Sequence, residues 1–254
     1  MKVIRLLVVN SSLMVFMTSN AFSKGAIDFE LTAYYVSKYI WRGQNLVDDP
    51  VFQSSISASY KGLTASIWGN LELTNIYGNS GDFSELDYSL DYSAKLPGME
   101  KIGYSIGTIY YDFPGTETKD TTELYWAVNF DLPLSPSVTL YHDLDEANGT
   151  YFSLRAEHSI DKIAQLGQDI PIGLQIGASL GAGSRSYNKY YWGTAQSKWN
   201  DLAFSVSFPI EIGGWTLAPS LNYVTLLRDD IRDADAYGTD SDFFFAGISL
   251  SKSF

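Results

Sequence analysis

The feature that most constrains this chain is an alternation of apolar and polar residues with a period of two, which recurs from residue 27 to residue 254. In the segment 63–73, for example, the odd positions are apolar or small and the even positions are mostly polar. Such a period is typical of β-strands with one apolar face, and no segment sustains a helical period. We count twelve alternating segments, at 27–35, 52–60, 63–73, 86–95, 102–110, 123–132, 138–144, 151–160, 172–180, 202–210, 215–226 and 243–254.

The connections between these segments alternate between long and short. The long ones are rich in Gly, Asn and Asp and lie at 41–50, 74–84, 114–121, 145–150, 182–200 and 228–240. The others are tight, as at 61–62, 96–99 and 213–214, except that the link 161–170 is expected to be longer. Long loops at one end, short turns at the other and an even number of strands are the arrangement of bacterial outer-membrane barrels.

The apolar faces have to point either into a core or into lipid. A soluble β-sandwich also alternates, and its aromatic residues would pack in that core. A closed barrel of about twelve strands, however, has a lumen wider than side chains fill, since about eight strands is the size at which they just do so. We therefore expect outward apolar faces and a closed sheet, because lipid does not tolerate open sheet edges. The 15% of Phe, Trp and Tyr, many of them near strand ends, is typical of membrane-barrel girdles.

The sequence thus predicts an all-β fold: a transmembrane, antiparallel, up-and-down β-barrel of about twelve strands, with ten or fourteen also compatible, in the bacterial outer membrane. At the N-terminus, Lys2 and Arg5 precede an apolar run over 6–17 and a small-residue stretch over 18–23. That is the pattern of a cleaved secretory signal, and the run is shorter than the ~20 residues of a spanning helix. Residues 1–23 are predicted to be the signal peptide and residues 24–254 the barrel.

Charge and cysteine content exclude several classes of function. Without residues 1–23 the chain has 15 basic and 29 acidic residues, a formal charge of −14, so nucleic acid is not an expected partner. The acidity serves either the solubility of an exported protein or the selection of cations. The absence of Cys removes disulfides, thiolate metal sites and Cys nucleophiles. No cofactor is expected.

Two stretches resemble known outer-membrane proteins. The last segment, 243–254, alternates and closes on Phe254, and so resembles the C-terminal signal through which such proteins engage the barrel-assembly machinery. Near the other end, YVSKYIWRGQ at 35–44, followed by PVFQ at 50–53 and ASIWGN at 65–70, resembles the TorF-type family of porin-like proteins, formerly catalogued as conserved hypothetical proteins. This resemblance covers most of the chain and implies pore formation, and it supplies no catalytic residues. Outer-membrane lipid and lipopolysaccharide are the other expected partners.

One face of the alternating segments carries the candidate lumen residues. They are mostly acidic: Asp28, Glu30, Glu72, Asp87, Asp91, Glu123, Asp131, Asp143, Arg155 and Glu157. In an open lumen these acids favour cations, as acidic rings do in channels. Alternatively, they pair with Arg and Lys and bond to Tyr and Ser across a plugged interior, where Trp68, Tyr125 and Tyr141 narrow the bore. Arg42, at the mouth, is expected either to stabilise a hairpin or to fold inward and meet an acid such as Glu72.

A catalytic or metal site is not predicted. Some barrel lipases set a His and a Ser two residues apart, but the residues two beyond His142 and His158 are Leu144 and Ile160, which cannot act as nucleophiles. The acidic loop 229–242 approaches a Ca²⁺ loop in its spacing but lacks the oxygen ligand at the fifth position and the closing Glu. A bridge from this loop to lipopolysaccharide through divalent ions stays open.

Three hypotheses of function follow. The first is a passive, narrow, weakly cation-preferring diffusion channel for small solutes. The second is a non-conducting structural or surface-binding barrel, which a lumen filled by packed aromatic residues would favour. The third is a loop-borne enzyme. Conductance in planar bilayers and the bore of the lumen distinguish the first two.

Overall fold

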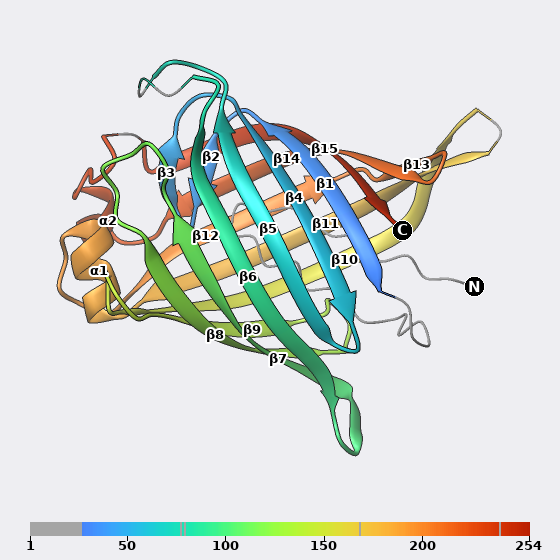
Figure 1. Cartoon of the computed structure of the whole chain (residues 1–254), viewed down its shortest axis with the longest axis horizontal. Coiled ribbons are helices and arrows are strands. Elements are labelled where there is room, and N and C mark those ends of the chain that lie inside the picture. The colour runs from blue at the N-terminus through green and yellow to red at the C-terminus, as the bar shows by residue number, and fades with distance from the viewer. Residues whose placement is uncertain (1–26, 77, 79, 168, 239) are drawn as a thin grey trace.

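The computed structural model describes residues 27–76, 78, 80–167, 169–238 and 240–254, so the predicted signal peptide lies outside the described residues. Its main element is an antiparallel sheet in which every strand has two neighbours and the pairing of β10 with β11 completes the ring (Figure 1). The strands are β1 (Asp28–Val36), β4 (Val51–Tyr60), β5 (Leu63–Glu72), β6 (Phe83–Leu96), β7 (Met99–Asp112), β8 (Thr121–Phe130), β9 (Ser137–Asp143), β10 (Thr150–Leu166), β11 (Ile170–Gly183), β12 (Lys198–Ser207), β13 (Ile210–Ile212), β14 (Trp215–Leu226) and β15 (Asp242–Ser253).

The short strand β13 continues β12, because it lies between the same two neighbours, β11 and β14. If β12 and β13 are counted as one strand, the ring has twelve strands. The predicted closed, up-and-down barrel of twelve strands is confirmed. The prediction of a longer loop at 161–170 is wrong. Residues 161–166 belong to β10, which pairs with β11 as far as Leu166 across a register irregularity after Ile160.

The outward face is apolar, as the alternation predicted. Leu31, Ile56, Ile67, Tyr88 and Tyr110 form one continuous row of cross-strand neighbours on β1, β4, β5, β6 and β7. All five side chains are exposed. A contiguous belt of this kind is unfavourable in water and favourable in hydrocarbon, where a closed sheet also satisfies every strand's backbone groups. The chain is a barrel of the bacterial outer membrane.

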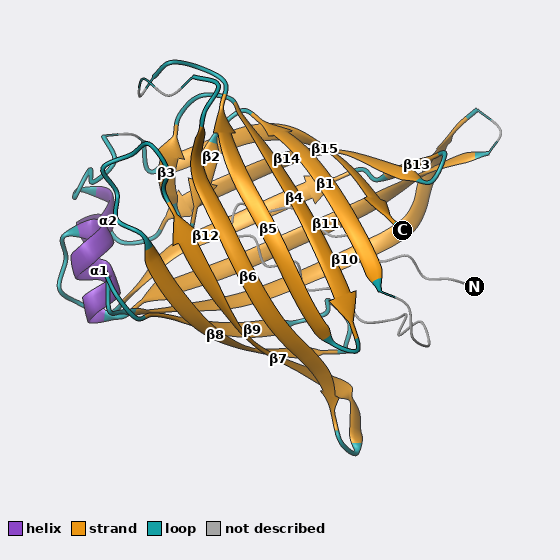
Figure 2. Cartoon of the chain, in the orientation of Figure 1, coloured by secondary structure: helices purple, strands orange, loops and turns teal. Residues whose placement is uncertain are grey.

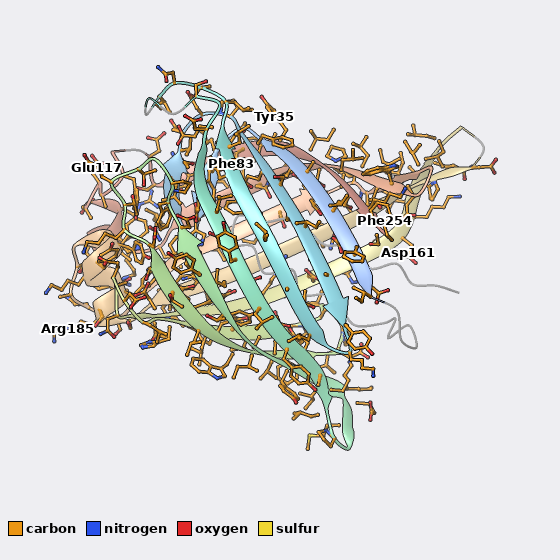
Figure 3. All side chains as sticks on the ribbon, viewed as in Figure 1. Tyr35, Phe83, Glu117, Asp161, Arg185 and Phe254 are labelled. Carbon is orange, nitrogen blue, oxygen red and sulfur yellow. The ribbon has the colours of Figure 1, made fainter. Side chains whose placement is uncertain are left out.

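The two ends of the barrel differ. Both helices, α1 (Arg185–Trp192) and α2 (Asp229–Arg232), lie in the long loops at one end, which we call the outer end (Figure 2). Phe254 and Asp161 lie at the other, periplasmic end, opposite Arg185 and Glu117 (Figure 3). None of the described residues forms a helix that is long and apolar enough to cross a bilayer.

Aromatic side chains line both ends of the outward face. Tyr60 and Tyr92 are exposed near the periplasmic end, and Tyr35 and Tyr223 near the outer end. Lys252, on the outward face of β15 near its periplasmic end, places its Nζ 5.1 Å from the ring centroid of Trp215 and 4.9 Å from that of Phe254. The ammonium thus reaches the interface over aromatic faces.

Candidate functional site

A short hairpin folds into the lumen at the outer end. Its strands, β2 (Tyr39–Trp41) and β3 (Gln44–Val47), form a separate two-stranded sheet. The turn between them consists of Arg42 (φ 49°) and Gly43 (φ 82°), the pair of positive φ values that a two-residue hairpin turn requires. A Cβ on Gly43 would come within 2.8 Å of Leu226 and 2.9 Å of Asp201, so the position needs glycine for space as well.

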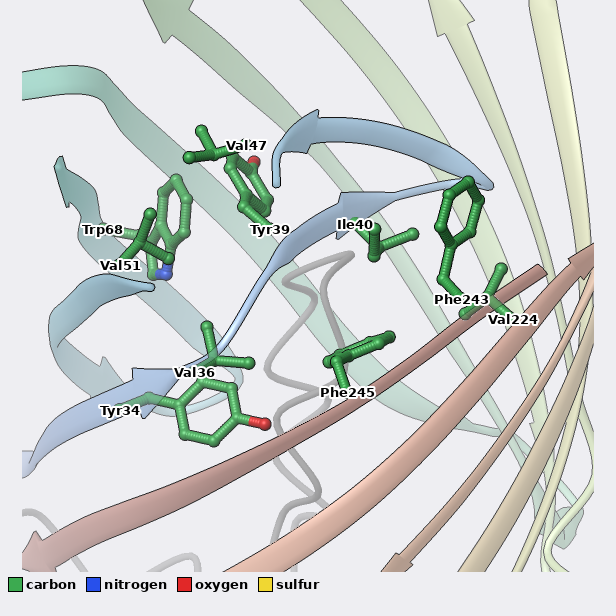
Figure 4. Packing of buried hydrophobic residues seen from close by; sticks show 10 residues of the cluster. All are labelled: Tyr34, Val36, Tyr39, Ile40, Val47, Val51, Trp68, Val224, Phe243 and Phe245. Carbon is green, nitrogen blue, oxygen red and sulfur yellow. The ribbon is translucent and has the colours of Figure 1, made fainter. Parts of the chain in front are cut away.

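The hairpin packs against the barrel wall on both sides of β1 and β4. Tyr39 lies against Trp68 of β5, with ring centroids 5.7 Å apart. Ile40 is 1% exposed and belongs to the same buried cluster as Phe243 and Phe245 of β15 (Figure 4). Because β5, β4, β1 and β15 are consecutive in the ring, these contacts hold the base of the hairpin to the wall from which it rises. Its tip reaches β8, five places from β1 in the ring, so the hairpin crosses the lumen.

Arg42, at the tip of the hairpin, forms a buried ion pair with Glu123 of β8. Its Nη1 and Nη2 donate to Oε1 and Oε2 of Glu123, each at 2.7 Å, and both side chains are 2% exposed. The hydroxyl of Tyr111 donates to the same carboxylate at 2.7 Å. This fork-to-fork geometry is the strongest form of an arginine–carboxylate contact.

Aromatic rings enclose the same guanidinium group. Its central carbon lies 4.1 Å from the ring centroid of Tyr141, 4.7 Å from that of Tyr151 and 4.3 Å from that of Trp41. Each ring presents its face to the cation, which gains from the ring quadrupole, most of all where water is excluded. Tyr141 and Tyr151 are wall residues, whereas Trp41 belongs to the hairpin.

The wall tyrosines continue as a row of rings. Tyr125, Tyr141 and Tyr151 are direct cross-strand neighbours on β8, β9 and β10. Their centroids are 6.0 Å and 6.3 Å apart, and Tyr187 of α1 follows at 5.3 Å from Tyr151. The outer half of the lumen is thus filled by packed aromatic side chains and the hairpin, as the plugged alternative anticipated.

Further hydrogen bonds tie the hairpin to the outer loops and to wall acids. Gln44 donates from Nε2 to the hydroxyl of Tyr187 at 3.0 Å and accepts a short hydrogen bond from Tyr237. The Tyr39 hydroxyl donates to Glu85 of β6 at 2.9 Å. Both the outer loops and the barrel wall therefore anchor the hairpin in the lumen.

Most candidate lumen acids on the strands have protein partners. Asp143 is 1% exposed and accepts from Thr121 at 2.6 Å and from three backbone N–H groups of its own loop, at 2.9 to 3.0 Å, so it closes the β9–β10 turn. Asp91 accepts from the hydroxyl of Tyr125 at 2.7 Å. Arg155 pairs with Glu157 at 3.4 Å. The ion pair neutralises Glu157, and the hydrogen bonds engage the carboxylates of Asp143 and Asp91 within the protein.

Of the remaining candidates, Asp87 borders the Arg42 cluster, because it is the cross-strand neighbour of Tyr111. Oε2 of Glu72 and Oδ1 of Asp87 are buried without a hydrogen-bond partner among the described residues. Asp28 and Glu30 lie on the inward register of β1 at the periplasmic end. Asp131 follows β8 and is exposed in the β8–β9 link. The suggested contact between Arg42 and Glu72 is wrong, since the hairpin tip reaches β8 instead.

Sequence reasoning missed two wall acids. Glu85 and Asp201 are buried on the inward face, and each lies one residue before a predicted segment, 86–95 or 202–210. Asp201 accepts from the hydroxyl of Tyr151 at 2.8 Å. Extending each alternating segment by one residue would have found both.

The periplasmic half of the inward face has short side chains. Ser57, Ser66 and Ser89 are cross-strand neighbours on β4, β5 and β6. On the opposite wall, Ser207 of β12 lies beside Ser220 of β14. These serines take up less of the lumen than the aromatic rings of the outer half do, and Ser57 and Ser207 are buried.

Neither histidine has a nucleophile two residues further along its own strand. Across the sheet, however, Nδ1 of His142 lies 2.9 Å from the hydroxyl of Thr150. The hydroxyl is the only hydrogen-bond partner of this ring among the described residues, so no carboxylate or amide orients the imidazole as a general base requires. The pair links β9 to β10 on the outward face and does not form a hydrolytic triad.

The acidic loop 229–242 uses its carboxylates within the protein. Asp230 of α2 pairs with Lys198 at 2.7 Å, and Asp242 with Arg232 at 2.7 Å. Ile231, between them in sequence, is fully buried against Trp192 and Leu226. Within the described ranges, no three His, Asp or Glu side chains are grouped so that they could hold a metal ion.

Comparison with solved structures finds other barrels of this kind. LpxR from Salmonella typhimurium is 9% identical, with 89% of this chain and 99% of that chain covered and a TM-score of 0.51. An outer-membrane channel from Pseudomonas putida F1 is 7% identical, with 98% and 100% covered and a TM-score of 0.48. The porin NanC is 12% identical, with 88% and 97% covered and a TM-score of 0.45. At these identities the likeness concerns the fold.

No family model and no curated protein matches the chain. Membership of the TorF-type family therefore stays a prediction, as does engagement of the barrel-assembly machinery by the strand that ends at Phe254.

Proposed function

We propose that the chain is an outer-membrane diffusion channel for small cationic solutes, in which the hairpin β2–β3 is the gate and this structure is the closed state. The observation that carries the proposal is the independence of the hairpin. Its strands pair only with each other, and no backbone hydrogen bond between residues 39–47 and the barrel occurs among the described residues. Withdrawing the hairpin breaks side-chain contacts but no strand ladder of the barrel.

The preference for cations follows from the charge of the inward face. Arg42 neutralises Glu123, but Glu72, Glu85, Asp87 and Asp201 remain on the wall around the hairpin. An acidic bore with low-dielectric walls concentrates cations and repels anions. The short serines of the periplasmic half take up less of the passage than the aromatic rings of the outer half do.

Planar-bilayer recordings test the proposal. Wild-type protein is expected to show brief, infrequent openings. A variant in which residues 39–47 are replaced by a Gly-Ser linker is expected to stay open, with a reversal potential in a KCl gradient that shows cation preference. The control replaces residues 114–119, in the long loop between β7 and β8, by a Gly-Ser linker, and should behave like wild type. A folded, inserted variant without the hairpin that passes no current, or that prefers anions, contradicts the proposal.

The packed rings of the outer half favour a second candidate, a non-conducting structural barrel in which the hairpin is a permanent plug. The same recordings separate the two candidates. If wild-type protein never opens at any voltage while the variant without the hairpin conducts, the hairpin is a plug and the second candidate is correct.

A further inference from the structure

We infer that the wall around Arg42 is a binding site for a guanidinium-bearing solute, and that Arg42 occupies it as an internal competitor. The site consists of Glu123, Tyr111, Tyr141 and Tyr151, which we call the cage. Its members come from four consecutive barrel strands, β8, β7, β9 and β10, and none belongs to the hairpin. The cage therefore remains when Arg42 leaves.

The geometry of the cage suits a planar guanidinium group. The carboxylate of Glu123 receives two parallel N–H donors at 2.7 Å each, which only a fork of two nitrogens supplies. Two ring faces, those of Tyr141 and Tyr151, lie 4.1 Å and 4.7 Å from the guanidinium carbon. An ammonium group has no planar fork and is more strongly hydrated, so it fits this arrangement less well.

The cage is held in place without the hairpin. The hydroxyl of Tyr111 fixes Oε2 of Glu123 at 2.7 Å. Tyr141 is supported on one side by Tyr125, and Tyr151 donates its hydroxyl to Asp201 at 2.8 Å. An empty cage leaves a buried, uncompensated carboxylate, which strongly favours the entry of another cation.

Arg42 is not an ideal occupant. Its Nε is buried and has no hydrogen-bond partner in the part of the chain that the structure describes. An unsatisfied buried donor weakens the internal contact relative to a ligand that bears no such constraint. Exchange of Arg42 for a solute would release the tip of the hairpin. This coupling between binding and opening rests on the proposed channel function. Binding of a solute in the cage does not rest on it.

Binding to the empty cage is measured by isothermal titration of Arg42→Ala protein in detergent micelles. Methylguanidinium is the ligand and methylammonium the comparison. The expected result is saturable binding of methylguanidinium, at least about ten-fold tighter than that of methylammonium, and its loss in the double variant Arg42→Ala/Glu123→Gln. If the alanine variant does not fold, Arg42→Gln, which keeps an amide donor at the tip, replaces it. Equal affinity for both ligands, or binding that survives Glu123→Gln, overturns the inference.

Conductance separates the cage from the channel. Methylguanidinium, and not methylammonium, is expected to raise the opening frequency of wild-type protein. Selective binding in the calorimeter with no current from any variant supports the cage and rejects the channel. Current from the variant without the hairpin, together with unselective binding, supports the channel and rejects the cage.

Discussion

At the scale of single residues, Arg42 decides the closed arrangement of the lumen. The sequence identified it as a residue of the mouth that would either shape a hairpin or fold inward, and it does both. Its partner was not predictable from alternation. Glu72 and Glu123 both occupy inward positions, and which of them the tip reaches depends on how the chain bends between Val36 and Tyr39.

The ion pair gives a thermodynamic prediction. Arg42→Ala leaves Glu123 buried and unpaired, so we expect it to lower the free energy of unfolding by about 3–5 kcal/mol. The double variant with Glu123→Gln is expected to lose less than the sum of the two single losses. Urea unfolding in lipid vesicles, followed by tryptophan fluorescence, measures these differences.

Arg155→Ala is the matched control. Its ion pair with Glu157 is partly exposed, at 21% and 29% of the two side chains, so the loss should be below about 1 kcal/mol. Equal losses for Arg42→Ala and Arg155→Ala would show that burial does not strengthen the inner pair.

At the scale of elements, the barrel strands were predictable and the inserted hairpin was not. Every barrel strand overlaps a predicted segment, because a half-buried strand imposes its period on many residues. The strands β2 and β3 have three and four residues, too few for a period to appear, and both of their faces are buried. Glu85 and Asp201 were missed for a different reason: each lies one residue before its predicted segment, and strand ends are the part of a strand that a pattern places least well.

The hairpin β10–β11 extends beyond the membrane. β10 has 17 residues, whereas about 9–11 residues of a tilted strand cross a bilayer. Replacing residues 161–173 by Asn-Gly, so that the turn follows the last regular pair Ile160–Leu174, is therefore expected to leave a folded barrel. Resistance of the unheated protein to protease measures this. Loss of the folded form would mean that the extension stabilises the barrel.

The contact between α2 and β12 depends on pH. Lys198, 2.7 Å from Asp230, lowers the pKa of that carboxyl below its ordinary value of about 3.9. A carboxyl with a lowered pKa contributes stability that is full above the ordinary value and is lost as the pH falls through the lowered one. We expect α2 to stay docked at pH 5 and to loosen only in stronger acid.

The ¹⁹F signal of 5-fluorotryptophan at Trp192 reports this docking, because Trp192 packs on Ile231 of α2. Asp230→Asn should show the loosened signal already at pH 5 and little further change on acidification. Identical titrations of wild type and variant would exclude Asp230 as the responsible group.

At the scale of the whole molecule, the closed barrel was predictable and its contents were not. Strand number and outward apolar faces follow from a pattern repeated along the chain, and closure follows from the demands of lipid. The row from Tyr125 to Tyr151 depends on the register between three strands. Alternation specifies which face a residue occupies, but it does not specify which residues of neighbouring strands lie side by side.

Charge selectivity belongs to this scale. In the variant without the hairpin, Glu72→Gln/Asp87→Asn removes two carboxylates, each of which has one buried oxygen without a hydrogen-bond partner in the described chain. We expect the ratio of cation to anion permeability to fall several-fold, since the bore loses part of its field. Glu100→Gln/Glu117→Gln removes the same charge from exposed positions at the two ends and should leave the ratio nearly unchanged. An equal fall in both variants would place the selectivity outside the lumen.

The position of the hairpin also bears on how the protein is made. The hairpin follows β1 near the beginning of the chain, yet part of its packing surface comes from Phe243 and Phe245 near the end. β1 and β15 meet at the seam that joins the first strand to the last. The hairpin therefore acquires its complete surroundings only when the seam forms, so the closed arrangement of the lumen is a late product of folding, reached after the first and last strands have joined.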